Sequence, residues 1–167
     1  PDSGLGKHAP ISRDYPYYIL LETEGAKPDQ DKELFEVVLN EVLEEGLLLD
    51  AVLPQSGAER AALWEIRDNI ICLADMLPVN LFDVSVPINN MPSFLADCEQ
   101  QLKARWPKVE QVVFGHLGDG NLHYVVSVHD DSARDDIQAI VYGCLISAEG
   151  AVSAEHGIGL EKRDWLH

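Results

Sequence analysis

The chain has 167 residues, of which 46% are hydrophobic, so it is long enough to build a well-packed globular domain. Its formal net charge of −17 argues against binding to nucleic acid or to an anionic membrane, because both carry negative charge. Its apolar runs are shorter than the roughly 18 residues of a membrane-spanning helix, and its first residues do not resemble a signal peptide. We therefore expect a globular, cytoplasmic protein whose three cysteines stay reduced.

The periodicity of the chain predicts one domain preceded by a short irregular segment. Residues 1–14 show no periodicity, and we expect them to be a tail or to lead into a domain that covers residues 15–167. Strand-like and helix-like segments alternate in that region without a linker or an internal repeat. Because two of the strands are joined by a tight turn, we predict an α+β fold in which helices cover one face of a mostly antiparallel sheet.

The first half of the domain contains two apolar runs of strand length, residues 17–24 and 47–53. Between them, residues 31–45 repeat apolar side chains at a spacing of three and four, which predicts an amphipathic helix. Ser56 and Glu59 have the spacing of a capping box and predict the start of a second helix. The apolar stripe of that second helix is Leu63, Ile66, Ile70, Leu73 and Leu77.

The second half begins with a strand predicted over residues 81–88. A helix is predicted to begin near Asn90, because Pro92 is tolerated in a first turn. Another helix is predicted to begin near Ser132 and to end before Gly150. A pair of strands lies between these two helices.

That pair is the stretch over residues 112–128, in which two apolar, β-branched runs flank Asp119-Gly120. An Asp-Gly dipeptide between such runs is a strong signal for a hairpin with a two-residue loop. With this loop, His116 stands directly opposite His123, and directly opposed residues share one face of the sheet. A slip of one residue would place them on opposite faces, so the prediction depends on the turn.

A second polar stretch, SAEHGIG at residues 153–159, carries Glu155 and His156 before two glycines. Two histidines and one carboxylate suit an open catalytic metal site, and His156 would then remain as a base. However, a histidine pair in a hairpin is more often hydrogen-bonded than metal-bound, and polar residues near glycines usually mark a solvated loop. The residues alone leave both interpretations open.

The segments GHLGDGNLH at 115–123 and AEHGIGLEKR at 154–163 resemble the C-terminal, substrate-side domain of FAD-linked oxidases with the vanillyl-alcohol-oxidase fold. This group includes D-lactate dehydrogenases, the glycolate oxidase flavin subunit and D-2-hydroxyglutarate dehydrogenases. LWEIRDNI at 63–70 and DVSVP at 83–87 fit it as well. The resemblance implies a ferredoxin-like cap domain, an N-terminal domain outside this chain that holds most of the FAD, and further residues beyond the end of this chain.

The resemblance also implies roles for individual residues. It places His116, His123 and Glu155 on a divalent metal, commonly zinc. It places Arg67 on the substrate carboxylate and His156 on the hydroxyl proton, although Arg67 by itself reads as a surface arginine paired with an acid. The implied reaction is FAD-dependent oxidation of a D-2-hydroxy acid such as D-lactate, with a separate electron acceptor and a homodimer as expected partners. This chain alone is expected to be inactive.

Three positions depart from the pattern that we expect in hydroxyglutarate-specific members. Where those have a hydroxyl residue, a lysine and an asparagine, this chain has Ile71, Leu81 and Val125. We therefore expect an apolar pocket wall and a substrate with a small or apolar side chain, because burying an unpaired carboxylate is costly. Two other functions fit the same residues: a metal-dependent hydrolase, and a non-catalytic module that holds a structural ion.

Overall fold

The computed structural model describes residues 12, 14–68, 70–160 and 162–166. The chain divides into two units, Pro1–Cys72 and Leu73–His167. Within the described residues, no helix combines the length and the apolar character needed to cross a membrane. The predicted boundary after residue 14 falls next to residues outside the described part and stays a prediction.

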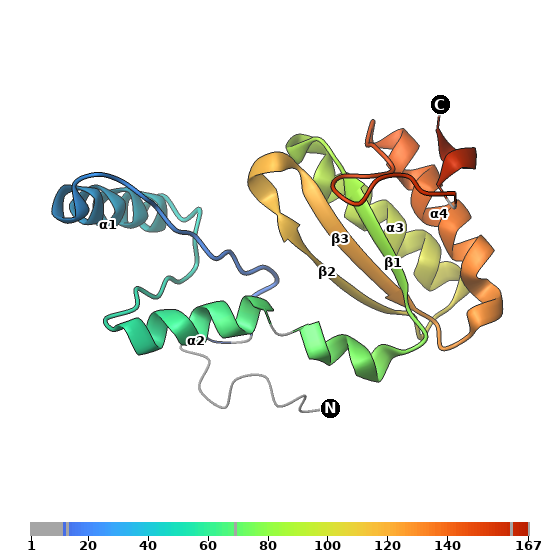
Figure 1. Ribbon diagram of the computed structural model, residues 1–167, viewed down its shortest axis with the longest axis horizontal. Helices are drawn as coiled ribbons and strands as arrows, with labels where there is room; N and C mark the ends of the chain where they lie inside the picture. Colours follow the sequence, from blue (N-terminus) through green and yellow to red (C-terminus); the bar gives the residue numbers. More distant parts are fainter. Residues whose placement is uncertain (1–11, 13, 69, 161, 167) are drawn as a thin grey trace. The chain divides into compact units, whose positions relative to one another are not determined.

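The first unit contains two helices, α1 (Pro28–Glu44) and α2 (Gly57–Asp68) (Figure 1). α1 confirms the predicted amphipathic helix and begins earlier than expected, because the fixed φ of proline suits a first turn. The capping box is present at α2: the Glu59 amide donates to Ser56 Oγ at 3.2 Å. The Glu59 carboxylate accepts from the amide of Gln55, at 2.7 Å. Neither helix buries a side chain.

Both strands predicted in the first unit are wrong. Residues 17–24 and 47–53 have no strand structure, and Tyr17 and Leu49 are 75% and 73% exposed. An apolar run becomes a strand only when a neighbouring strand completes its backbone hydrogen bonds, and the described residues supply no such neighbour for either run. The second predicted helix is also shorter than its apolar stripe, because α2 ends at Asp68 and a 3₁₀ helix follows.

The second unit is built on a three-stranded antiparallel sheet with the strand order β1-β3-β2 (Figure 1). The strand and helix predictions for this half are confirmed, with small shifts at their ends. The elements are β1 (Asn80–Ser85), α3 (Met91–Arg105), β2 (Glu110–His116), β3 (Asn121–Ser127) and α4 (Arg134–Ser147). The 3₁₀ helices among the described residues are η1 (Ile70–Met76), η2 (Ile88–Asn90), η3 (Leu117–Asp119), η4 (Asp131–Ala133) and η5 (Arg163–Trp165).

The connectivity of this unit is that of a ferredoxin-like fold. α3 joins β1 to β2, the hairpin joins β2 to β3, and α4 brings the chain back to the free edge of β1. There Ala151 forms a single antiparallel bridge with Ser85. The order β-α-β-β-α-β is therefore complete, with its last strand reduced to one bridge. The predicted α+β class is confirmed.

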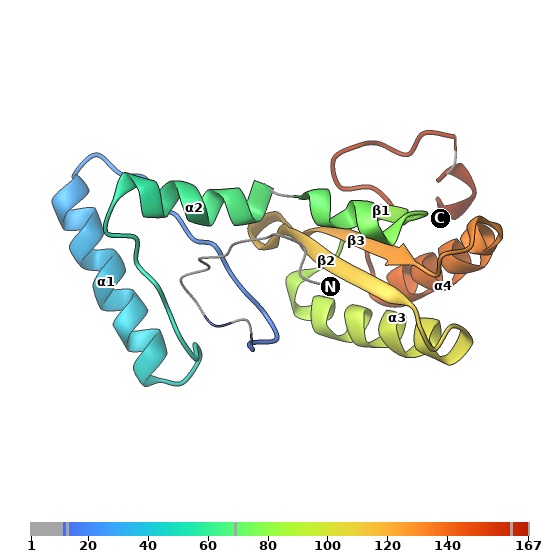
Figure 2. The ribbon, with the colours of Figure 1, turned by 90° about the horizontal axis from the view of Figure 1, so that it is seen from below.

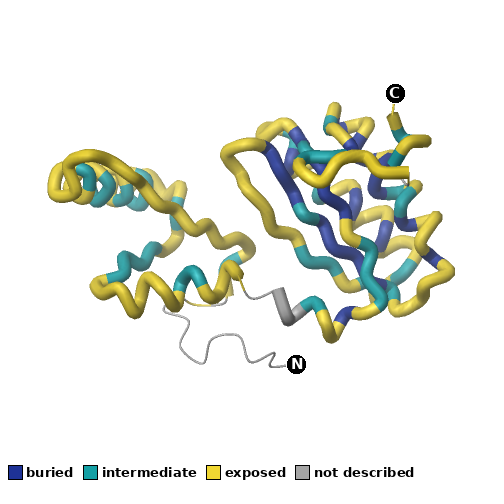
Figure 3. Tube along the Cα trace, viewed as in Figure 1, coloured by how far each residue is buried: buried dark blue, intermediate teal, exposed yellow. Residues whose placement is uncertain are grey.

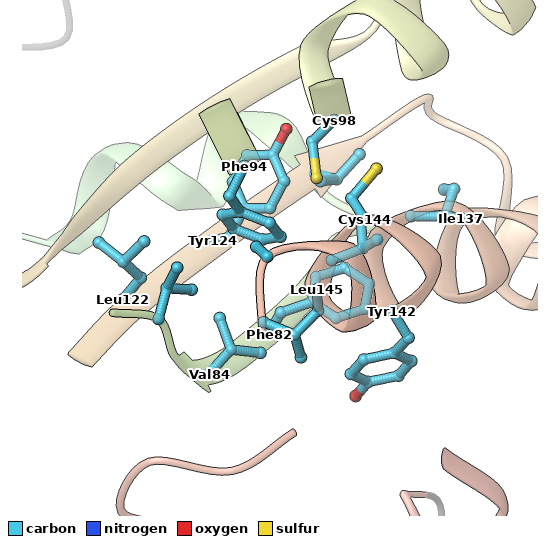
Figure 4. Close-up of a cluster of buried hydrophobic side chains, with 14 of the residues drawn as sticks. Phe82, Val84, Phe94, Cys98, Leu122, Tyr124, Ile137, Tyr142, Cys144 and Leu145 are labelled. Atoms are coloured by element: carbon cyan, nitrogen blue, oxygen red, sulfur yellow. The ribbon is translucent and has the colours of Figure 1, made fainter. Parts of the chain in front are cut away.

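The hydrophobic core lies between the sheet and the two helices α3 and α4, which cover the same face (Figures 1 and 2). Buried residues are concentrated in this unit (Figure 3). In Figure 4 the Phe82 ring meets Tyr142 edge to face at 5.4 Å, and Phe94 meets Tyr124 in the same way at 6.1 Å. Two cysteines, Cys98 and Cys144, are buried in this core without a disulfide bond. The side chain of Cys72 lies outside the described residues, and the reduced state of the three cysteines stays a prediction.

The hairpin formed by β2 and β3 is confirmed, but its register differs from the prediction. His116 is opposite Asn121 rather than His123, and His123 is opposite Phe114. The residue opposite His116 is thus two positions earlier on β3 than predicted. Because side chains alternate with a period of two, a shift of two residues leaves His116 and His123 on the same face.

The turn explains the altered register. It contains η3 followed by Gly120, which adopts the left-handed conformation with φ +76, so the loop is longer than two residues. The Asp119 carboxylate accepts from the Asn121 amide at 3.1 Å, and this side-chain bond closes the turn. Asp119 and Gly120 are therefore turn residues, as predicted, but in a wider turn.

Gly115 controls how closely the two strands of the hairpin approach. A Cβ at this position would lie 2.2 Å from the backbone oxygen of Asn121. We predict that Gly115→Ala lowers the free energy of unfolding by about 1–3 kcal/mol, because the pairing must shift to make room. Gly118→Ala is the control, since its Cβ would meet no heavy atom within 4 Å.

Urea denaturation of both variants measures the difference. The control should change the unfolding free energy by less than about 0.5 kcal/mol. Equal losses of unfolding free energy in the two variants would contradict the assignment of a close approach at Gly115.

Candidate functional site

The face of the sheet opposite α3 and α4 carries a cluster of polar side chains. Alternation along the strands directs the odd-numbered residues of β1 and β3 to this face. Two neighbouring cross-strand rows on it are Asp83–His123–Phe114 and Ser85–Asn121–His116. The two histidines of the hairpin therefore lie in adjacent rows, diagonally across β2 and β3.

The two imidazoles are close to each other. The ring centroids of His116 and His123 are 6.1 Å apart, and the rings are nearly perpendicular, at 86°. The His116 side chain is 43% exposed, whereas that of His123 is only 14% exposed. The structure thus brings the predicted pair together, with one ring more accessible than the other.

The segment that follows α4 crosses this polar face, on the side of the sheet away from the helices (Figure 2). It brings Glu155 Oε1 to 3.5 Å from His116 Nδ1. It also stacks the His156 ring against His123, with centroids 6.0 Å apart and an interplanar angle of 25°. Four residues that sequence analysis singled out from two distant stretches are therefore gathered in one place.

Asp83 lies at the centre of this cluster, and sequence analysis missed it. It is only 4% exposed. Its Oδ2 accepts from the backbone amides of Glu155, at 3.1 Å, and His156, at 2.9 Å. The Nδ1 atom of His156 is 3.5 Å from Oδ2, and the Nδ1 atom of His123 is 3.7 Å from Oδ1. The available signal was a lone carboxylate within an apolar strand, which rarely occurs without a partner.

The Asp83 carboxylate is held in its charged form. Burial raises its pKa, but hydrogen bonds from the amides of His156 and Glu155, together with the nearby His156 and Lys162, outweigh burial and lower the pKa overall. The group is therefore ionised at neutral pH.

Several buried polar atoms around the cluster have no hydrogen-bond partner among the described residues. They are Asp83 Oδ1, both amide atoms of the Asn121 side chain, and Ser153 Oγ. Asp83 and Asn121 occupy the two polar rows, and Ser153 belongs to the segment that follows α4. Because unsatisfied buried polar groups are costly, these atoms require partners such as ordered water or a polar ligand.

The potential metal ligands form two overlapping groups. One group is Asp83, His123 and Glu155, and the other is His116, Asp119 and Glu155; within each, one ligand atom per residue lies within 4.8 Å of the others. Glu155 belongs to both. The predicted set of His116, His123 and Glu155 does not itself form one of these groups; Glu155 shares one group with His123 and the other with His116.

A pocket of about 290 Å³ adjoins His156 and is lined by Leu81, Asp83, Lys162 and the turn from Gly157 to Gly159. Lys162 Nζ donates to the backbone oxygen of Asp83 at 3.1 Å. The wall is therefore not purely apolar, contrary to expectation.

Of the other two positions expected in the wall, Val125 does not line this pocket. Val125 is fully buried, with 0% exposure, so it offers no surface to a ligand. The backbone of Ile71 lies in η1, but its side chain is outside the described residues. Leu81, which is 56% exposed, lies in the wall of this pocket.

Arg67 belongs to the first unit, on α2. Its Nη1 is 2.7 Å from Asp68 Oδ1, and its guanidinium carbon is 5.8 Å from the centre of the Trp64 ring. These contacts are those of a surface arginine paired with an acid. Its contact with a substrate stays a prediction.

Comparisons with known proteins found a matching family and several relatives. Residues 3–167 match the family described as FAD linked oxidases, C-terminal domain. The chain is 38% identical over 170 residues to a D-2-hydroxyglutarate dehydrogenase of Xanthomonas citri pv. viticola, which covers 96% of this chain and 35% of the relative. It is 34% identical to the mitochondrial D-2-hydroxyglutarate dehydrogenase of Bos taurus, over 97% of this chain and 30% of the relative.

A further relative is a protein of Schizosaccharomyces pombe provisionally named as a mitochondrial D-lactate dehydrogenase. The two are 31% identical over 177 residues, which covers 99% of this chain and 34% of that protein. The chain thus spans about a third of the length of these relatives.

Proposed function

Because this chain belongs to the family of FAD-linked oxidase C-terminal domains, we propose that it is the substrate- and metal-binding part of an FAD-dependent D-2-hydroxy-acid dehydrogenase. The observation that supports this proposal is the gathering of His116, His123, Glu155 and His156 on one face of the sheet. A hydrolase or a structural ion site could use the same donors, but membership of an FAD-linked family favours oxidation.

The donor set fits a divalent ion, for which we propose zinc. Two imidazoles and a carboxylate are typical ligands of catalytic zinc, and they leave a position for substrate. His116 and His123 would hold the ion from the sheet, and Glu155 would hold it from the segment after α4. The bound ion would lower the pKa of the substrate hydroxyl.

We propose His156 as the base. Its side chain is 64% exposed and lines the pocket, while its Nδ1 is 3.5 Å from the Asp83 carboxylate. An Nδ1–H facing this carboxylate leaves Nε2 as the proton acceptor. In the proposed reaction His156 Nε2 would take the hydroxyl proton as the carbon–oxygen double bond forms, and the chemistry supplied by bound FAD would be the acceptance of the hydride that leaves C2.

The remaining partners follow from this chemistry. The FAD-binding part would lie in the portion of the protein that the relatives have and this chain does not span. A separate electron acceptor must reoxidise the flavin. We propose Arg67 as the group that binds the substrate carboxylate, by a bidentate pair. The homodimer and the cytoplasmic location stay predictions.

The first prediction from this proposal concerns metal binding. The full-length protein should bind about one zinc ion per chain, and His123→Asn should weaken binding by more than the roughly 10–100-fold typical of residues that only support a ligand. His129→Asn is the matched control, because His129 lies beyond the other end of β3 and pairs with Glu110. Elemental analysis measures the zinc content of these proteins, and competitive zinc titration measures their zinc affinity. A correctly folded wild-type protein without a divalent ion would remove this assignment.

The second prediction concerns the base. His156→Ala should slow flavin reduction by a D-2-hydroxy acid by roughly 10²–10⁴-fold, the usual contribution of a positioned base. Substrate affinity should change much less, because the metal ligands remain. Stopped-flow absorbance of the flavin follows the reaction. Reduction at the wild-type rate would exclude His156 from proton transfer, and no reduction by any 2-hydroxy acid in the wild type would refute the function.

The third prediction concerns the substrate side chain. Lys162 brings a cation into the pocket beside Leu81, so a second carboxylate could be paired there. If Lys162 pairs with this second carboxylate, Lys162→Met should lower kcat/KM for D-2-hydroxyglutarate by about 10–100-fold, the value of one hydrogen bond to a charged group. D-lactate, which lacks that carboxylate, should change by only a few-fold.

The control is Lys103→Met on α3, where Lys103 pairs with Glu99 on the same helix. Equal losses of kcat/KM for D-lactate and D-2-hydroxyglutarate in Lys162→Met would show that Lys162 does not bind the side chain of the substrate.

A further inference from the structure

We propose that Asp83 is the positioning residue of this site. Its Oδ2 holds the adjacent backbone amides of Glu155 and His156 against the sheet, and its Oδ1 orients the His123 ring through Nδ1–H. In this way one carboxylate places a metal ligand from the hairpin, a second ligand from the segment after α4, and the base. Its importance for catalysis rests on the function proposed above, but the positioning itself does not.

The first step of the argument is the anchoring of the segment after α4. That segment is attached to β1 at three points, the last of which is the bond from Lys162 Nζ to the backbone oxygen of Asp83. At Ala151 it exchanges two backbone hydrogen bonds with Ser85, of 3.0 and 2.8 Å. The second point is Asp83, two residues away on the same face of β1, which accepts from both the Glu155 and the His156 amides. Without this carboxylate, the segment would keep the attachment at Ala151, before the two functional side chains, and that of Lys162, after them, but none at Glu155 or His156 themselves.

The second step concerns the other oxygen of the carboxylate. Asp83 and His123 are directly paired between β1 and β3, so their side chains stand next to each other on the open face. Oδ1 is buried, has no hydrogen-bond partner among the described residues, and is 3.7 Å from His123 Nδ1. A small rotation of the ring would close this distance. An Nδ1–H···carboxylate pair would fix the tautomer that presents Nε2 to a ligand.

The third step is the cost of this arrangement. A charged side chain that is 4% exposed is unfavourable unless hydrogen bonds and nearby charges compensate it. Two amides, together with Lys162 bound to the backbone oxygen of Asp83, supply that compensation. An apolar residue at this position would serve packing equally well without these partners. The carboxylate therefore serves the geometry of the site rather than the stability of the sheet.

Asp83→Asn in the full-length protein tests the proposal, because it keeps the shape and removes one acceptor oxygen and the charge. The control is Asp130→Asn, which removes a charge at an exposed carboxylate that accepts from the Ser132 amide, in the loop after β3. Both are measured in metal-free protein by hydrogen exchange and by NMR of ¹⁵N-labelled histidines. His123→Asn identifies the His123 signals.

In Asp83→Asn we expect the Glu155 and His156 amides to exchange at least about tenfold faster, because they lose a charge-assisted hydrogen bond. We expect His123 to change from the Nδ1–H tautomer to a mixture of both tautomers. Zinc, added afterwards, should bind roughly 10–100-fold more weakly. Asp130→Asn should show none of these changes, and exchange of the α4 amides should be the same in all proteins.

Two results would overturn the proposal. Unchanged exchange and an unchanged tautomer in metal-free Asp83→Asn would show that Asp83 positions neither group, and weaker zinc binding alone would make it a ligand instead. If the variant does not fold, the tautomer of His123 in the wild-type protein tests the proposal, because an Nε2–H tautomer there would contradict it directly. None of these measurements uses flavin or substrate, so failure of the proposed function would be seen separately.

Discussion

Two hydrogen bonds from adjacent backbone amides to one buried carboxylate oxygen hold the polar face of this fold together. The carboxylate of Asp83 belongs to a central segment of β1, whereas the amides belong to Glu155 and His156. Because the bonded residues also carry the functional side chains, the backbone anchor and the site cannot move independently. The amides also keep the pKa of Asp83 low despite its burial, so the same bonds maintain the charge that the two neighbouring histidines face.

The sheet separates stability from function by the alternation of its strands. In β1, Phe82 and Val84 point into the core against α3 and α4, while Asp83 and Ser85 point to the open face. A side chain on one face can change without altering the packing of the other, because the two sets are separated by the backbone. The fold can therefore place charged and titratable groups in the middle of a strand and still bury a continuous apolar layer.

The shortened last strand of the ferredoxin-like order gives the site its second set of side chains. Glu155 approaches His116 and the adjacent His156 stacks on His123, so consecutive residues face the same side of the sheet. A regular strand would direct them to opposite faces. After the bridge at Ala151 the chain leaves strand geometry, which allows both side chains to contribute. The ferredoxin-like order thus ends in a loop at the point where the site requires one.

The sequence by itself determined the elements whose causes lie within a few residues: the helix over residues 31–45, set by its apolar period, and the hairpin, set by its Asp-Gly turn and flanking β-branched runs. It also singled out the four polar residues, because each stands out from apolar or glycine-rich surroundings. Only the tertiary structure decided that residues 17–24 and 47–53 are not strands, since strand formation depends on a neighbour far away in the chain. It alone revealed Asp83, because the two amides bonded to that carboxylate are more than seventy residues distant and no local pattern encodes them.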